Sequence, residues 1–257
     1  MGKKEIQNPI DNFLNADKKS SVWCPGCGIG IVVNAFLQTI RKLDLSLSDF
    51  CVASSGIGCT GKIIEHLNTE QLVLKNTDLY SSLADFRHKN QEKKLIVFLN
   101  ECDLMISGID GLLNICHQGM DLTVIFINSF TYHLFIEHRE FSSMPFRKNS
   151  SSDASDSPLN IPLIIKSCGA SFMARWTPLH CRRLMFSMKK ALNKQGFSFI
   201  EVLSPCLMYH ASDGNLGKKL DRMGILLKNS TIEKNENPEE LEIRKGKKFI
   251  IGNFIDK

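Results

Sequence analysis

The sequence predicts an α/β protein with a doubly wound, mainly parallel sheet and helices on both faces. Buried strand segments alternate with helical segments along the chain, the pattern of such folds. The clearest unit runs from the apolar strand Leu95–Leu99 through a helix over Leu104–His117 to the strand Leu122–Ile127. A connection of this length joins parallel strands by a right-handed crossover. In addition, the short strand Phe50–Ala53 runs into a glycine loop at Gly56–Gly61.

The remaining elements follow from the spacing of apolar residues. Helices are expected over Ile29–Leu43, Ile63–Leu67, Leu79–Phe86, Leu159–Ser167 and Pro178–Lys194. Further strands are expected over Ser171–Arg175 and Phe197–Leu203. The polar stretch Ser150–Pro158 between these groups predicts an exposed loop.

We divide the 257 residues into three parts. Residues 1–20 are polar and without a sustained period, so we expect a flexible N-terminal tail. Residues 21–206 form the α/β domain. Residues 207–257 are charged and end near the apolar run Phe249–Ile251, so we expect an extension that packs on the domain or on a partner.

Composition excludes some classes of function. The net charge of +5 is mild, and Lys and Arg are spread along the chain, which argues against a nucleic-acid-binding protein but allows an acidic electron-transfer partner. No stretch approaches the ~18 apolar residues of a membrane span. The segment Met1–Ile6 lacks the apolar core of a signal peptide, so we expect a cytoplasmic protein without a membrane anchor.

Four of the nine cysteines lie in turns rich in Gly or Pro. Cys24 and Cys27 form a C-x-x-C turn just before a helix, whereas Cys59 and Cys206 each follow a predicted strand. Loops at the carboxyl ends of parallel strands gather in one crevice, so all four thiols could meet there. Four thiolates suit a [4Fe–4S] cluster or a structural zinc ion. A redox disulfide between Cys24 and Cys27 would leave Cys59 and Cys206 without a role.

Five separated segments resemble the β subunit of 2-oxoacid:ferredoxin oxidoreductases, and the 2-oxoglutarate type most closely. They are Trp23–Gly28, Ser55–Cys59, Asp121–Asn128, Gly169–Arg175 and Gly196–Cys206. The resemblance covers about residues 20–257. It implies a thiamine-diphosphate-binding fold, an α-type partner subunit and electron transfer to ferredoxin or a similar acceptor. It also implies that Cys24, Cys27, Cys59 and Cys206 bind a [4Fe–4S] cluster.

The thiamine site departs from the family pattern. The family has Gly-Asp-Gly-Asp where this chain has Asn100-Glu101-Cys102-Asp103, and Asn-Asn where it has Asn128-Ser129. The resemblance therefore assigns the Mg²⁺ positions to Glu101, Ser129 and the carbonyl of Thr131. Glu101 is one methylene longer than Asp, and the Ser129 hydroxyl is shorter than an amide, whereas Mg²⁺ demands compact octahedral coordination.

Two more segments of the thiamine site are altered. The family's His-Gly-Arg aligns with Lys75–Thr77, and its Gly-rich stretch aligns with His133–His138, where Phe135 and Ile136 are bulky. We therefore expect a β-type subunit that keeps the cluster and relays electrons, with binding of thiamine diphosphate and Mg²⁺ weakened or lost.

The alternative is an active β subunit that catalyses the thiamine-dependent oxidative decarboxylation of a 2-oxoacid of the 2-oxoglutarate class, forming an acyl-CoA from coenzyme A and reducing ferredoxin. Glu101 and Asp103 would then lie near the metal, and Lys62 or Lys75 would face the diphosphate. A zinc-bound scaffold is a third possibility, and no catalytic residue can be assigned. Asp103 can also be explained as the cap of the helix that follows it.

Overall fold

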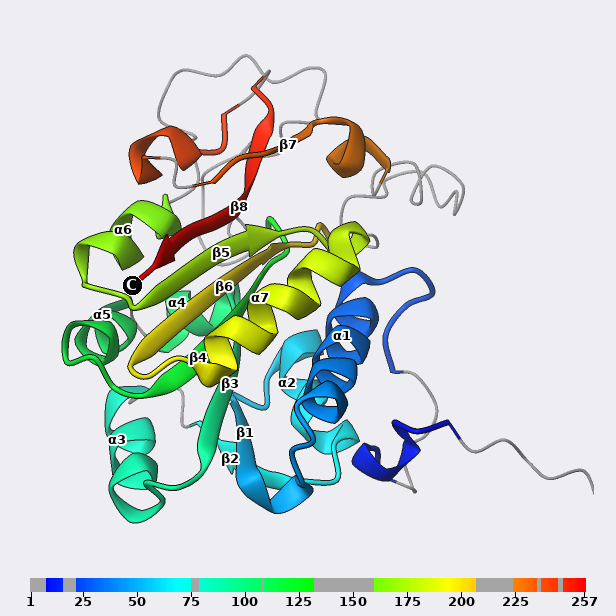
Figure 1. Cartoon of the computed structure of the whole chain (residues 1–257), viewed down its shortest axis with the longest axis vertical. Helices are drawn as coiled ribbons and strands as arrows, with labels where there is room; N and C mark the ends of the chain where they lie inside the picture. Colours follow the sequence, from blue (N-terminus) through cyan, green and yellow to red (C-terminus); the bar gives the residue numbers. More distant parts are fainter. Residues whose placement is uncertain are drawn as a thin grey trace, which may run out of the picture.

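The computed structural model describes residues 8–15, 22–74, 79–107, 109–131, 160–206, 224–234, 237–244 and 247–257, without the side chains of 105–107 and 238–239. These residues contain an eight-stranded sheet with the strand order β2-β1-β3-β4-β6-β5-β8-β7 (Figure 1). All neighbouring strands are parallel except β5 and β8, which are antiparallel. The predicted mainly parallel sheet is thereby confirmed.

The strands are β1 (Phe50–Ser54), β2 (Glu70–Val73), β3 (Lys94–Asn100), β4 (Leu122–Asn128), β5 (Phe172–Trp176), β6 (Phe197–Leu203), β7 (Ser230–Ile232) and β8 (Phe249–Asp256). The α-helices are α1 (Gly28–Lys42), α2 (Gly58–His66), α3 (Leu79–Lys89), α4 (Glu101–Ser107), α5 (Ile109–His117), α6 (Ile161–Ser167) and α7 (Cys181–Asn193). Short 3-10 turns are η1 (Asp11–Phe13), η3 (Leu47–Asp49), η6 (Pro178–His180) and η7 (Pro238–Leu241).

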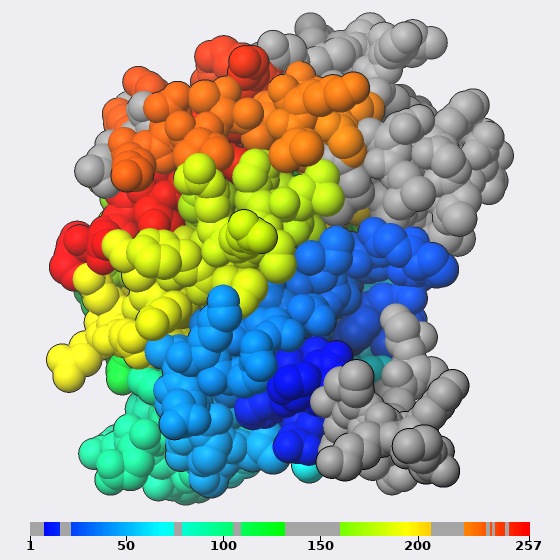
Figure 2. Space-filling view, turned by 45° about the vertical axis from the view of Figure 1, so that its right-hand side comes forward, coloured from blue at the N-terminus to red at the C-terminus, as the bar shows by residue number. Residues whose placement is uncertain are grey.

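Helices cover both faces of the sheet. α1, α2 and α7 pack on one face, and α3, α5 and α6 pack on the other. Figure 1 shows α1 and α7 side by side across the sheet, and in Figure 2 their surfaces, blue and yellow, adjoin on one side of the molecule. This is the three-layer architecture that the alternating strands and helices predict.

The central strands are apolar throughout because both of their faces are covered. In β3, Ile96 and Phe98 point toward the α1 side, where Phe98 meets Phe36 edge-on with ring centroids 5.5 Å apart. Leu95 and Val97 point toward the opposite side, into the core with α3 and α5. Each central strand therefore joins two hydrophobic cores, which fixes its register.

Several predicted helices begin at other residues than expected; α2, for example, begins at Gly58 rather than at Ile63. The helix predicted over Leu104–His117 begins at Glu101 and forms two segments, α4 and α5. It begins early because Asn100 and Asp103 cap each other: the Asn100 side chain accepts from the Asp103 amide (3.0 Å), and Asp103 accepts from the Asn100 amide (2.7 Å). The helix predicted from Pro178 becomes α-helical only at Cys181, after the 3-10 turn η6.

Three strands were missed or underestimated. β2 and β7 are short and partly exposed, so neither has the apolar run that marks a buried strand. β8 extends the apolar run Phe249–Ile251 to Asp256, and only its pairing with β5 makes it part of the sheet.

The proposed division at residues 20 and 206 remains a prediction. Residues 8–15 pack on the domain, where Ile10 is buried and Leu14 forms a bridge with Leu67. In the C-terminal part, β7 and β8 belong to the same sheet as β5. The predicted loop Ser150–Pro158 lies outside the described residues.

Among the described helices, none combines the length and the apolar character needed to cross a membrane.

A close backbone contact holds α2 against the loop that precedes it. A Cβ atom on Gly61 would lie 2.3 Å from the carbonyl carbon of Gly56. Gly56 itself has φ +73°, a conformation that favours glycine. The start of α2, which carries Cys59, therefore depends on two glycines: Gly61 leaves room for the backbone of Gly56, and Gly56 adopts the positive φ of the loop.

We expect Gly61→Ala to lower the free energy of unfolding by about 3 kcal/mol or more, because backbone would have to move. The matched control is Gly30→Ala in α1, where the nearest atom would be Trp23 Cε3 at 3.8 Å. The control should raise stability by up to about 1 kcal/mol, the helix preference of Ala over Gly. Urea denaturation of both variants measures the difference. A stable Gly61→Ala chain would contradict the contact.

Candidate functional site

The candidate site lies at the carboxyl ends of four neighbouring strands. β1, β3, β4 and β6 are parallel and adjacent, so the segments that follow them meet at one edge of the sheet. These segments carry Cys59, Glu101, Ser129 and Cys206. The predicted cluster and magnesium residues therefore lie on the same edge of the sheet.

The first cysteine turn is fastened to α2. The Cys27 amide donates to the Cys24 carbonyl (2.9 Å), and Gly26 between them has φ +78°, which closes the turn. The indole Nε1 of Trp23 donates to the carbonyl of Cys59 (2.8 Å). The turn with Cys24 and Cys27 is thus held beside Cys59.

The same turn is also packed against the segment with Cys206. A Cβ atom on Gly28, the first residue of α1, would lie 2.1 Å from the Ser204 hydroxyl oxygen. The Cys206 amide donates to the carbonyl of Ser129 (3.1 Å). The three cysteine segments therefore converge from α1, α2 and the end of β6.

Electrostatics shows that the four thiols are neighbours. Burial raises the pKa of Cys27 to about 11, with smaller contributions from the charges of Cys59, Cys206 and Cys24, although a hydrogen bond from the Ile29 amide opposes the rise. The pKa of Cys59 is also raised, first by burial and then by Cys206 and Cys24, while the nearby Lys62 opposes the rise. Without a metal, Cys27 and Cys59 favour the protonated thiol, and binding of a cation would have to displace their protons.

The thiols do not form a finished ligand set. In the part of the chain that the structure describes, no group of three or more His, Cys, Asp or Glu side chains is arranged to hold a metal ion. Cys24 and Cys59 are exposed, and Cys27 and Cys206 are half-buried. The donor chemistry fits an iron–sulfur cluster, but the side chains must turn toward one centre to bind it.

The three predicted Mg²⁺ positions lie together and bond to one another. Glu101 is fully buried. One of its carboxylate oxygens accepts from the Ser129 hydroxyl (2.9 Å), and the other accepts from the Thr131 amide (3.3 Å). The Ser129 and Thr131 hydroxyls are 2.8 Å apart. Both carboxylate oxygens of Glu101 are therefore already satisfied by the protein.

Burial also changes the charge of this site. It raises the pKa of Glu101 to about 7, although hydrogen bonds from Ser129 and Thr131 oppose the rise. Near neutral pH, the carboxyl group is consequently divided between its neutral and anionic forms. An anionic oxygen cage of the kind that Mg²⁺ prefers is not preformed at Glu101.

The other predicted cofactor residues have different surroundings. The carboxylate of Asp103 caps α4, and burial raises its pKa while a hydrogen bond from Ser55 opposes the rise. Lys62 is exposed on α2, one turn after Cys59, so its charge acts on that thiol. Cys102 is half-buried. The remaining predicted positions lie outside the described residues: they are Lys75–Thr77, which includes Lys75, and His133–His138.

Two contributions were not found from the sequence. Trp23 connects two cysteine segments through its indole. The hydroxyl of Thr131 bonds to Ser129, whereas the family resemblance assigns a role only to the Thr131 carbonyl. A signal existed for Thr131, because two hydroxyl residues two positions apart follow a buried strand. No signal in the sequence pairs Trp23 with Cys59, 36 residues away.

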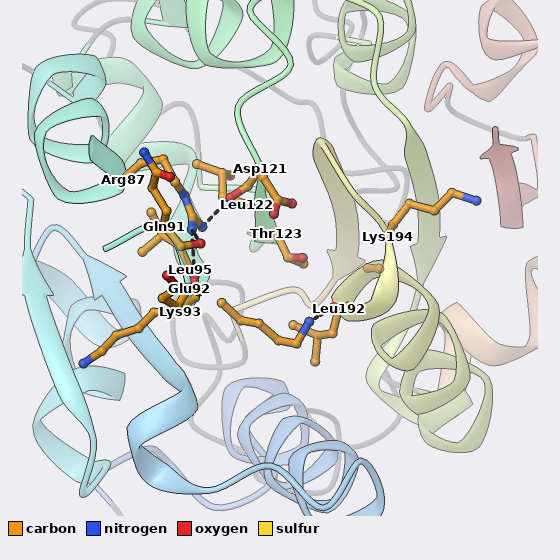
Figure 3. A pocket seen from close by; sticks show the side chains of 12 residues that line it. Arg87, Gln91, Glu92, Lys93, Leu95, Asp121, Leu122, Thr123, Leu192 and Lys194 are labelled. Atoms are coloured by element: carbon orange, nitrogen blue, oxygen red, sulfur yellow. Dashed lines mark hydrogen bonds between the residues drawn. The ribbon is translucent and has the colours of Figure 1, made fainter. Parts of the chain in front are cut away.

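A small polar cavity of about 80 Å³ lies at the opposite edge of the sheet, beside the first residues of β3 and β4 (Figure 3). Two of its cations bond to backbone carbonyls, Arg87 to those of Lys93 (2.7 Å) and Asp121, and Lys94 to that of Leu192 (2.7 Å), while Lys93 and Lys194 bond to carboxylates. Lys94 thereby caps the carboxyl end of α7. The cavity is separate from the candidate site, and these cations have structural partners.

Comparison with known proteins shows the family to which the chain belongs. A family model described as "Thiamine pyrophosphate enzyme, C-terminal TPP binding domain" matches residues 82–202. The 2-oxoacid:ferredoxin oxidoreductase subunit beta of Saccharolobus solfataricus is 29% identical over 200 residues, covering 73% of this chain and 63% of that protein. The 2-oxoglutarate synthase subunit KorB of Methanocaldococcus jannaschii is 30% identical over 252 residues, covering 97% and 92%. The chain belongs to the family of 2-oxoacid:ferredoxin oxidoreductase β subunits.

The 2-oxoglutarate type is the most similar, as the sequence motifs predict. KorB of Methanothermobacter marburgensis is 29% identical over 255 residues, covering 97% of this chain and 88% of that protein. A solved structure of 2-oxoglutarate:ferredoxin oxidoreductase from Magnetococcus marinus, with 2-oxoglutarate, coenzyme A and succinyl-CoA bound, has the same fold. It aligns with a TM-score of 0.77 at 16% identity, over 99% of this chain and 87% of that chain.

The raised pKa of Glu101 predicts that stability falls as pH rises. Between about pH 4.5 and pH 7 the folded chain keeps a proton that the unfolded chain releases, so raising the pH favours unfolding. At about 1.4 kcal/mol per pH unit, the loss reaches about 3 kcal/mol by pH 7 and then levels off. Glu101→Gln should remove this loss in urea denaturation at pH 5 and pH 8. The exposed Glu92→Gln should keep it, and a Glu101→Gln chain with unchanged pH dependence would contradict the assignment.

Proposed function

We propose that this chain is a β-type subunit that binds a [4Fe–4S] cluster and relays electrons within a 2-oxoacid:ferredoxin oxidoreductase complex, with binding of thiamine diphosphate and Mg²⁺ weakened or lost. The cluster ligands are Cys24, Cys27, Cys59 and Cys206. An α-type subunit is the partner, and ferredoxin or a similar carrier accepts the electrons. The single observation that carries the proposal is the contrast between four neighbouring thiols and a Glu101 carboxylate already bonded within the protein.

The cluster assignment is supported by chemistry and by packing. Thiolates are the ordinary ligands of [4Fe–4S] clusters, and when bound the cluster accepts and passes on single electrons. Gly28 and Gly61 bring the three cysteine segments close together, and Trp23 bonds to the Cys59 backbone. Lys62 next to Cys59 would favour the thiolate that the cluster needs.

The loss of Mg²⁺ binding is supported by the bonding and burial of Glu101. To bind the metal, Glu101 would have to give up the Ser129 hydroxyl and the Thr131 amide and remain charged while buried. Mg²⁺ also requires oxygens at about 2.1 Å in an octahedral arrangement. The residues present do not fit the ion as they are arranged, so we assign no reaction step to thiamine diphosphate.

One observation favours the second candidate, an active β subunit that oxidatively decarboxylates a 2-oxoacid, transfers the acyl group to coenzyme A and passes the two electrons to ferredoxin. Glu101, Ser129 and Thr131 lie within hydrogen-bonding distance of one another at the strand ends, as a metal site requires. Binding of the diphosphate would have to reorganise these bonds. The same measurements separate the two candidates.

For the cluster, we expect anaerobically purified protein to contain about four iron and four sulfide per chain. Cys59→Ser and Cys206→Ser should each lose most of the iron and the visible absorbance. Cys168→Ser, at a half-buried cysteine at the end of α6, is the matched control and should keep both. Full iron content in Cys59→Ser would refute the ligand assignment, and a zinc-loaded, iron-free protein would refute the cluster.

For the cofactor, we expect no binding of thiamine diphosphate below about 1 mM in calorimetry with Mg²⁺, about −4 kcal/mol of binding free energy or weaker. The combined variant Glu101→Asp, Cys102→Gly, Ser129→Asn should bind more tightly, because it restores the family's metal ligands and one glycine of the Gly-Asp-Gly-Asp motif. Micromolar binding by the unchanged chain, with reduction of a viologen dye by 2-oxoglutarate, would establish the active enzyme instead.

A further inference from the structure

Three buried polar side chains on neighbouring strands have no place in the sites described so far. Asn128 ends β4, Glu201 lies in β6 and Arg175 lies in β5, and each is at most 2% exposed. Their pairing is continuous: Arg175 Nε donates to one oxygen of Glu201 (2.6 Å), and Asn128 Nδ2 donates to the other (2.8 Å). The three form one chain of hydrogen bonds across the sheet.

This chain of hydrogen bonds ends at the turn that follows β4. Because Glu201 can only accept, it fixes the orientation of the Asn128 amide and turns its oxygen toward the Phe130 amide (3.2 Å). Phe130 is fully buried with φ +58°, a conformation that costs energy for a residue other than glycine. The turn therefore depends on a bond that holds Phe130 in place.

The turn contacts both parts of the candidate site, the Glu101 carboxylate and the segment with Cys206. The Ser129 hydroxyl bonds to Glu101, and the Ser129 carbonyl accepts from the Cys206 amide. The Asn128 carbonyl also accepts from the Ser204 amide (2.8 Å). At the other end of the chain of bonds, Arg175 Nη1 donates to the carbonyl of Leu241 (2.7 Å) in η7. One network thus connects the C-terminal segment with the residues proposed to serve the cluster and the metal.

We infer that Asn128, Glu201 and Arg175 are positioning residues that hold the turn 128–131, and through it align Ser129 and the backbone of Cys206. A buried ion pair adds little stability over apolar packing, so its value here is the geometry it imposes. The statement that the turn serves a cluster and a metal site rests on the proposed function. The statement that the three residues fix the conformation of the turn does not, and it can be tested in the chain without cluster or cofactor.

The test uses two variants whose hydrogen bonds can be counted. Glu201→Gln keeps the shape but replaces one acceptor by a donor, so Arg175, Asn128 or Phe130 must lose its partner. Adding Asn128→Asp restores the pairing: the new amide nitrogen at 201 donates to the new carboxylate at 128, whose other oxygen accepts from Phe130. Glu70→Gln, which breaks the exposed ion pair with Lys93, is the matched control.

Hydrogen–deuterium exchange of the Phe130 amide, in the full-length chain, is the primary measurement. We expect about tenfold faster exchange in Glu201→Gln, the loss of roughly one hydrogen bond, and a return toward the original rate in the double variant. Glu70→Gln should leave the rate unchanged. Unchanged exchange in Glu201→Gln, absence of rescue, or failure of both variants to fold would each overturn the inference.

The second measurement is the rate at which an iron chelator removes iron from the anaerobic protein. We expect it to be several-fold faster in Glu201→Gln and to recover in the double variant, because Cys206 is bonded to the turn. If the unchanged chain holds no iron, the proposed cluster fails while the exchange result still decides the positioning role. Exchange that changes and recovers without any change in iron release would limit that role to the Glu101 side and overturn the link to Cys206.

Discussion

The parallel register of β3, β4 and β6 is the constraint on which the candidate site depends. Asn100 pairs with Ile127, and Asn128 pairs with Leu203, so the three strands end at nearly the same level. The next residues of each strand are therefore brought to one edge. A slip of one residue would turn every side chain of the strand to the other face and would separate Glu101 from Ser129. The two hydrophobic cores prevent such a slip.

The fold could be predicted from the sequence where local patterns were strong. Leu95–Leu99 and Leu122–Ile127 are long apolar runs, and both predict buried strands, because burial on both faces of a strand produces a continuous apolar run. β2 and β7 could not be recognised, since they gain their strand conformation by pairing at the margins of the sheet. The start of α4 was missed because the reciprocal cap of Asn100 and Asp103 became clear only in three dimensions.

For the candidate site, the sequence predicts which residues come together, whereas their bonding appears only in the structure. Spacing and resemblance predict that Cys24, Cys27, Cys59 and Cys206 meet at one place, and the structure shows that Ser129 bonds to Glu101. The buried state of Glu101 could not be read from a sequence in which Glu is ordinarily exposed. The long-range contacts of Trp23 and Arg175 cannot be predicted from the sequence for another reason, because they join segments that come together only when the chain folds.

The position of Trp23 gives this chain a natural optical reporter. The sequence contains two tryptophans, and the other, Trp176, is buried and bonded to the Ser187 hydroxyl (2.8 Å). Trp23 is half-buried, its ring lies 5.0 Å from that of His66, and its indole touches the backbone of a cysteine in the candidate cluster site. Binding of the proposed cluster should therefore quench the emission of Trp23 by energy transfer, so that no added label is needed. Reconstitution of the protein with iron and sulfide could then be followed in real time by its tryptophan fluorescence.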